Sequence, residues 1–163
     1  MAFGSTSVKG RALRYLAQRE HSRVELERKL ARHVEDTPDA TAAAQIAAAL
    51  DELGAHGLLD EARVAASVLN SQAPRYGARR LKQTLQAKGL APALVAATLQ
   101  QARGSELERA RDIWRRRFGA APADAAERAR QMSFLAGRGF EGDVIRRVVQ
   151  AKDDDAKDDD AWR

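Results

Sequence analysis

The sequence predicts an all-α protein made of three tandem three-helix repeats, each helix-turn-helix-like, that stack into an elongated, curved array. Its composition favours helix, because Ala is abundant and only 5% of the residues are aromatic. Apolar residues recur at helical spacing along most of the chain. The segment Leu85–Leu90 also returns as Leu135–Phe140, 50 residues later. Such self-similarity is typical of repeat proteins, whose units bury their apolar faces against their neighbours.

The first repeat is expected over residues 9–54. A helix follows Ser22–Glu25, whose residue types form a capping box in which the Ser and Glu side chains each bind a backbone N–H. Thr37-Pro38 predicts a cap followed by a proline in the first position of the next helix. Gly54 or Gly57 is expected to end that helix.

The second repeat is expected over residues 60–103 and the third over residues 105–151. Asp60 should cap the start of the second repeat, and Ser105–Glu108 predicts a second capping box at the start of the third. In the 50-residue match, a basic residue is followed by Gly89 or its counterpart and then by an apolar residue. Each such Gly should end a helix in the left-handed conformation. The last two helices are expected at residues 124–136 and from residue 141 onward.

Charge is distributed unevenly along the chain. Residues 1–72 have a net charge of −1, whereas residues 73–151 carry 16 Lys or Arg against 7 Asp or Glu, for a net charge of +9. Residues 152–163 have a net charge of −3 and contain six Asp, so we expect a disordered acidic tail. That tail either keeps the protein soluble or competes for the basic face.

The sequence argues against an enzyme. There is no Cys and there are three His, so thiol chemistry is excluded and a zinc site has few ligands. No nucleotide-binding, metalloprotease or hydrolase motif is present. We therefore predict no catalytic residue, no metal and no cofactor. No signal peptide or membrane-spanning run is visible, which predicts a cytoplasmic protein that does not enter a membrane.

The basic stretch supplies the candidate binding residues. Arg side chains pair bidentately with phosphates or carboxylates, so a row of them could follow a nucleic-acid backbone or an acidic protein groove. An Arg-rich solvated surface would give the same composition. The candidate residues are Arg75, Arg79, Arg80, Lys82, Lys88, Arg115, Arg116, Arg117, Arg138, Arg146 and Arg147.

The chain resembles the RecX family, the bacterial regulators of the RecA recombinase. The resemblance runs from about Gly10 to Val149 and depends on the order and spacing of short motifs. These are Ala12–Ala17, Arg19–Leu26, Lys29-Leu30, Leu50–Leu53, Gly57–Asp60, Ala65, Tyr76–Leu81, Leu85–Leu90 and Phe134–Phe140. The chain departs from the family where Arg32–Val34 lacks the usual Gly and where Val64 replaces an aromatic residue.

The resemblance implies three tandem three-helix repeats and a non-enzymatic modulator. Such a protein binds RecA, lies in the helical groove of its filament on single-stranded DNA, and limits filament growth, ATP hydrolysis, strand exchange and coprotease activity. We hypothesise that the candidate Arg and Lys residues supply this contact, in a protein that acts as a monomer. Two alternatives stay open: a stand-alone nucleic-acid-binding repeat protein, and an adaptor for another acidic protein.

Overall fold

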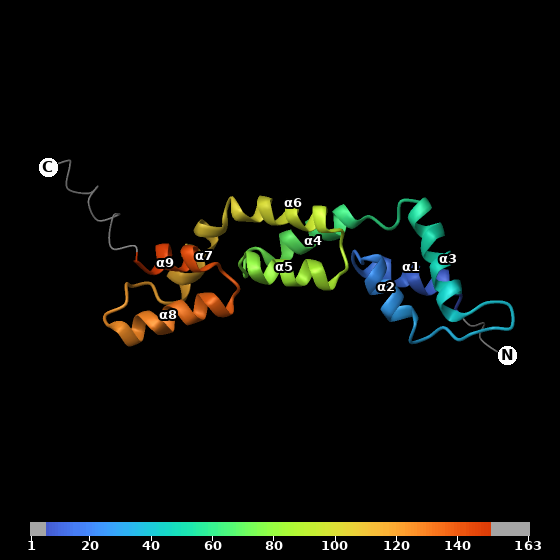
Figure 1. Ribbon diagram of the computed structural model, residues 1–163, viewed down its shortest axis with the longest axis horizontal. Helices are drawn as coiled ribbons and strands as arrows, with labels where there is room; N and C mark the ends of the chain where they lie inside the picture. Colours follow the sequence, from blue (N-terminus) through green and yellow to red (C-terminus); the bar gives the residue numbers. More distant parts are fainter. Residues whose placement is uncertain (1–5, 151–163) are drawn as a thin grey trace. The chain divides into compact units, whose positions relative to one another are not determined.

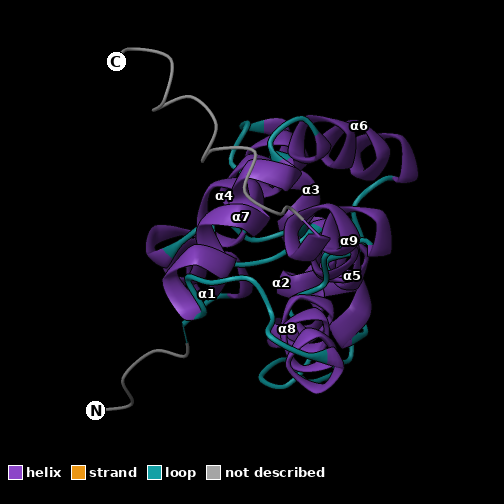
Figure 2. Cartoon of the chain, turned by 90° about the vertical axis from the view of Figure 1, so that its left-hand side faces the viewer, coloured by secondary structure: helices purple, strands orange, loops and turns teal. Residues whose placement is uncertain are grey.

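The computed structural model describes residues 6–150, and all regular secondary structure within them is helical (Figure 1, Figure 2). Nine helices lie in this range: α1 (Val8–Gln18), α2 (Arg23–Leu30), α3 (Ala42–Ala55), α4 (Glu61–Gln72), α5 (Ala78–Ala87), α6 (Pro92–Arg103), α7 (Glu106–Arg117), α8 (Ala125–Gly137) and α9 (Gly142–Gln150). The predicted all-α class is confirmed. The acidic tail predicted at residues 152–163 lies outside the described residues.

Contacts divide the described residues into two compact units. The first holds residues 6–68 and 84–95, and the second holds residues 69–83 and 96–150. Residues 60–103, which the sequence predicts as one repeat, contribute to both units. The repeat boundaries stay a prediction.

The first unit is built around α1, α2 and α3. Their core consists of Ala12, Leu26, Leu30, Ile46, Leu50 and Leu53. Helices this short are only marginally stable on their own. Burial of each Leu contributes about 2 kcal/mol, so packing of the apolar faces stabilises them. The capping box at the start of α2 is confirmed: the Glu25 backbone N–H donates to Ser22 Oγ at 3.2 Å, and the Ser22 N–H donates to Glu25 Oε2 at 2.9 Å.

The start of the third helix was wrongly predicted at Thr37-Pro38. The helix begins at Ala42, and Thr41 is its N-cap, with the Ala44 N–H donating to Thr41 Oγ1 at 3.2 Å. The Thr37 side chain instead accepts from the Ala40 N–H inside a turn. The end of the helix agrees with the sequence, because Gly57 has a φ of +70°.

The second unit packs α7, α8 and α9 around one core. Its buried residues are Ala110, Ile113, Leu135, Phe140, Val144, Ile145, Val148 and Val149. The buried Gln131 side chain lies beside this core, and both ends of its amide form hydrogen bonds. It accepts from Trp114 Nε1 at 2.7 Å and donates to the Ala120 carbonyl at 3.2 Å. The helices predicted near residues 124–136 and from residue 141 are confirmed as α8 and α9.

The capping box predicted at Ser105–Glu108 is wrong. Ser105 is the N-cap residue of α7, but its side chain makes no capping hydrogen bond and accepts from Arg109 Nε at 3.1 Å instead. Glu106 is buried and accepts from the Ala78 backbone N–H at 3.0 Å. Neither side chain therefore binds a backbone N–H of the first turn of α7.

The two segments of the 50-residue match make equivalent joints, one in each unit. In the second unit the turn after α8 receives the start of α5: the Gly77 N–H donates to the Arg138 carbonyl at 2.9 Å, and the Arg79 N–H donates to the Gly139 carbonyl at 3.0 Å. In the first unit the turn after α5 receives the start of α2, where Ser22 Oγ donates to the Lys88 carbonyl at 2.6 Å. The predicted left-handed Gly is confirmed in both turns, with φ values of +70° at Gly89 and +84° at Gly139.

The joint of the second unit has no room for a side chain at Gly77. A Cβ atom added to Gly77 would lie 2.4 Å from the Cα and from the backbone nitrogen of Phe140. Because these are backbone atoms, they cannot move aside without opening the joint. We expect Gly77→Ala to lower the free energy of unfolding by at least about 2 kcal/mol, which chemical denaturation followed by circular dichroism will measure.

Gly137→Ala is the matched control. Gly137 ends α8 close to the same joint, yet an added Cβ would meet nothing within 4 Å. Ala favours helix over Gly by roughly 1 kcal/mol, so this variant should be unchanged or slightly more stable. Equal losses in the two variants would contradict the close approach at Gly77.

Candidate functional site

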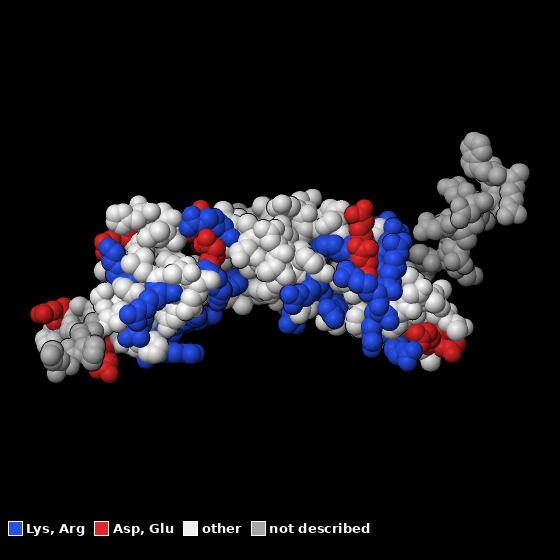
Figure 3. Space-filling model, turned by 180° about the vertical axis from the view of Figure 1, so that it is seen from behind, with Lys and Arg blue, Asp and Glu red and all other residues white. Residues whose placement is uncertain are grey.

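The second unit carries exposed basic side chains on α5, α7 and α9. Arg79 and Lys82 of α5 are exposed, whereas Leu81 and Leu85 of the same helix are buried. The last turn of α7 exposes Arg115, Arg116 and Arg117, where the partial negative charge of the helix C-terminus favours cations. Arg146 and Arg147 are exposed on α9. Figure 3 shows Lys and Arg side chains spread over the face opposite to that of Figure 1, with Asp and Glu among them.

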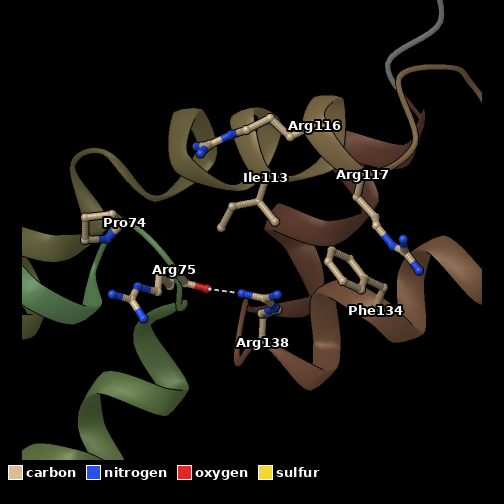
Figure 4. Close-up of a pocket in the computed structure, with 7 residues that line it drawn as sticks. All are labelled: Pro74, Arg75, Ile113, Arg116, Arg117, Phe134 and Arg138. Atoms are coloured by element: carbon tan, nitrogen blue, oxygen red, sulfur yellow. Dashed lines mark hydrogen bonds between the residues drawn. The ribbon is translucent and has the colours of Figure 1, made fainter.

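A surface hollow brings part of this set together (Figure 4). We call it the arginine hollow. It has a volume of about 530 Å³ and is lined by Pro74, Arg75, Ile113, Arg116, Arg117, Phe134 and Arg138. Pro74 and Arg75 come from the segment between α4 and α5, and Phe134 lies on α8. All the lining residues belong to the second unit.

Arg138 is held at the centre of this group by neutral partners. Its Nη1 donates to the Arg75 carbonyl at 3.4 Å, and its guanidinium carbon lies 5.2 Å from the centre of the Phe134 ring and 5.9 Å from that of Tyr76. Arg117 also approaches the Phe134 ring, at 5.9 Å. A cation over an aromatic face gains roughly 0.5–1 kcal/mol at an exposed site. These contacts orient the guanidinium groups without neutralising their charge.

The four arginines of the hollow have no acidic partner among the described residues. No ion pair there joins Arg75, Arg116, Arg117 or Arg138 to a carboxylate. Arg116 uses its Nε to donate to the Asp112 carbonyl of its own helix, at 3.2 Å. Four like charges around one hollow repel one another and favour the approach of an anion.

Sequence reasoning missed Arg109, which binds the backbone on both sides of Pro74 and Arg75. Its guanidinium donates to the Tyr76 and Ala102 carbonyls, each at 2.8 Å, and also to the Ala73 carbonyl. Burial lowers the pKa of Arg109, but an arginine remains protonated in proteins. Ser105, the N-cap residue of α7, lies four positions before Arg109, and this spacing predicts only that the two side chains are neighbours.

Lys88 differs from the other candidate residues because it lies in the joint of the first unit. Its Nζ donates to Glu25 Oε1 at 2.7 Å, and the two side chains are only 17% and 16% exposed. Burial alone would raise the pKa of Glu25, but hydrogen bonds from Lys88, the Ser22 N–H and Arg19 outweigh it and lower that pKa to about 2. The ammonium of Lys88 therefore neutralises a carboxylate of its own unit.

Other kinds of site have little support in the described part of the chain. Within residues 6–150, no group of three or more His, Asp or Glu side chains is placed to hold a metal ion. No helix in the same range is long and apolar enough to cross a membrane.

Comparison with known proteins connects these features to one family. Sequence models of the second and third three-helix domains of RecX match residues 60–99 and 105–149. A regulatory protein RecX from Leptothrix cholodnii is 52% identical over 147 residues, which cover 90% of each chain. Another from Ralstonia nicotianae is 44% identical over 147 residues, covering 90% of this chain and 89% of the relative. The chain belongs to the RecX family.

Solved structures support the fold of this RecX-family chain. The crystal structure of RecX from Lactobacillus salivarius matches 88% of this chain and 92% of its own length, with a TM-score of 0.69 at 20% sequence identity. A second RecX crystal structure matches 89% of this chain with a TM-score of 0.70. RecX proteins are regulatory proteins and not enzymes, so the family confirms the prediction that the chain is not an enzyme.

The low pKa of Glu25 should make the free energy of unfolding depend on pH. The folded-state pKa lies below the ordinary value of 4.5, so the stabilisation is present above about pH 4.5 and is lost as the pH falls toward 2. We expect Glu25→Gln to lower the free energy of unfolding by roughly 2–3 kcal/mol at pH 7, with the gap to the unaltered chain closing between about pH 4.5 and 2. Urea denaturation across this pH range will measure it.

Glu108→Gln is the matched control, since Glu108 is an exposed residue of α7. It loses the same charge and should change stability by no more than about 0.5 kcal/mol. A gap between Glu25→Gln and the unaltered chain that stayed constant down to pH 2 would contradict the assigned role of the Glu25 carboxylate.

Proposed function

We propose that this chain regulates RecA by binding the filament that RecA forms on single-stranded DNA. It limits filament growth, and with it ATP hydrolysis, strand exchange and coprotease activity. The observation that supports this most strongly is the close similarity to regulatory proteins RecX over about nine tenths of the chain. The alternative of a scaffold for an unrelated acidic protein has no comparable support.

The position of the basic residues supports the same proposal. The excess of positive charge in residues 73–151 falls on the two segments that match the second and third RecX domains. We propose that the filament contact is supplied by Arg79 and Lys82 on α5, Arg115 and Arg116 on α7, and Arg146 and Arg147 on α9, all of which are exposed. Charges presented on several short helices can contact a repeating, acidic target at several points.

The partner is thus the RecA filament, with single-stranded DNA reached directly or through it. The regulator acts as a monomer in the bacterial cytoplasm. We propose that the three repeats extend over residues 9–54, 60–103 and 105–151, and that one molecule contacts more than one RecA subunit. No cofactor or metal takes part in this action, because inhibition by docking requires only surface contact.

Charge reversal on α5 tests the proposal. We expect the double variant Arg79→Glu and Lys82→Glu to inhibit RecA-driven ATP hydrolysis on single-stranded DNA on the order of ten-fold less potently, since reversed charges at an interface repel instead of attracting. Both side chains are exposed, so the melting temperature should not change. The measurement is an ATPase titration with the purified full chain.

The double variant Arg14→Glu and Arg32→Glu is the control. It changes the net charge equally at two exposed positions of the first unit and should inhibit as the unaltered chain does. Undiminished inhibition by the α5 variant would count against the assigned contact. If the unaltered chain left the ATPase unchanged, DNA binding in the absence of RecA would favour the stand-alone nucleic-acid-binding protein, and no DNA binding would favour the adaptor.

A further inference from the structure

We propose that the arginine hollow is a direct binding site for the sugar–phosphate backbone of a single-stranded nucleic acid. This inference rests on the proposed function, because it names a contact that a regulator acting on single-stranded DNA would make. It goes further by assigning the contact to one hollow of the second unit and by requiring no RecA for binding.

The composition of the lining indicates an anionic ligand. Four of the seven lining residues are Arg, and none of the seven is acidic. A guanidinium fork binds phosphate oxygens bidentately, and the four arginines that line the hollow come from three separate segments of chain. Arg138 is already oriented by the Arg75 carbonyl and by two aromatic rings, so it loses little conformational freedom when an anion binds.

The same lining favours nucleic acid over an acidic peptide. Protein–protein interface cores are depleted in charged residues, whereas nucleic-acid interfaces are more polar and strongly positive. The apolar surface of the hollow is limited to Pro74, Ile113 and Phe134, and the guanidinium groups of Arg117 and Arg138 approach the Phe134 ring. An apolar side chain of a peptide would therefore meet two cations beside the Phe134 ring.

The size of the hollow favours a single strand over a duplex. A volume of about 530 Å³ is of the size that holds a small ligand such as one nucleotide. A single strand can insert an unstacked base and lay it against a guanidinium plane, but a duplex keeps its bases stacked inside. None of the lining residues is Asn, Gln, Asp or Glu, the types that read adenine or cytosine edges, so the hollow should not select these two bases.

The test is binding of a fluorescein-labelled oligothymidylate to the full chain without RecA, followed by fluorescence anisotropy at several NaCl concentrations. The variant is Arg75→Gln with Arg116→Gln, because both side chains are exposed and neither forms an ion pair in the described part of the chain. We expect binding on the order of ten-fold weaker, and a salt dependence shallower by roughly 1.4 in log–log slope, because each phosphate contact on a single strand contributes about 0.7.

The matched control is Arg103→Gln with Arg128→Gln, which removes two exposed charges of the second unit outside the hollow. This pair should keep the affinity and slope of the unaltered chain. Equal weakening by both pairs would show diffuse attraction and overturn the proposal. So would a duplex that binds as tightly as the single strand, or a polyglutamate that competes as well as unlabelled oligothymidylate does.

The ATPase assay separates this inference from the proposed function. If the hollow variant binds DNA normally while the unaltered chain still inhibits RecA, the hollow assignment fails and the proposed function stands. If the hollow variant loses DNA binding but the unaltered chain has no effect on RecA, the regulatory proposal fails and the site remains as assigned.

Discussion

The second unit depends on how the first backbone N–H groups of α5 are satisfied. A helix leaves these groups without partners inside the helix, and burial without a partner costs about 1–3 kcal/mol each. Here the N–H groups of Gly77 and Arg79 donate to carbonyls of the turn after α8, and the N–H of Ala78 between them donates to the Glu106 carboxylate. The start of α5 is thus fixed to α7 and to the turn between α8 and α9, and this places Arg75 and Arg138 in one hollow.

The chain has such a joint in each unit, at the turn that contains Gly89 or Gly139. The basic residue before the glycine has different partners in the two turns. In the first unit that residue is Lys88, whose ammonium is bound to the largely buried Glu25 carboxylate. In the second unit it is Arg138, whose partners are a carbonyl and two aromatic rings. One joint therefore neutralises its cation, while the other orients its cation and leaves the charge available. The same sequence repeat produces a structural contact in one unit and part of a candidate binding site in the other.

Local sequence rules predicted most of the helices but not the contacts between them. The periodicity, the Ser22 cap and the two left-handed glycines depend on neighbouring residues, and the structure has them as predicted. The errors at Thr37 and Ser105 arose where another donor or acceptor competed for a cap: Thr41 lies closer to its helix, and Arg109 takes the Ser105 oxygen. Charge counting located the basic stretch. It could not select the arginines that share a hollow, because that grouping depends on contacts between residues about 60 positions apart in sequence, such as Arg75 and Arg138.

A cluster of like charges keeps its potential only when its side chains are oriented by something other than counter-charges. Carboxylate partners would order the arginines of the hollow but would also cancel the potential that attracts an anion. Carbonyl oxygens and aromatic faces order them at a smaller electrostatic gain and leave the potential intact. Arg109 is likewise bound by neutral acceptors, because its guanidinium donates to three backbone carbonyls. Two of these carbonyls flank Arg75, so Arg109 also holds the segment that bears it. The contacts that orient Arg138 and those that hold the segment bearing Arg75 therefore use the same kind of neutral acceptor, the backbone carbonyl, and neither cancels the positive potential of the surface.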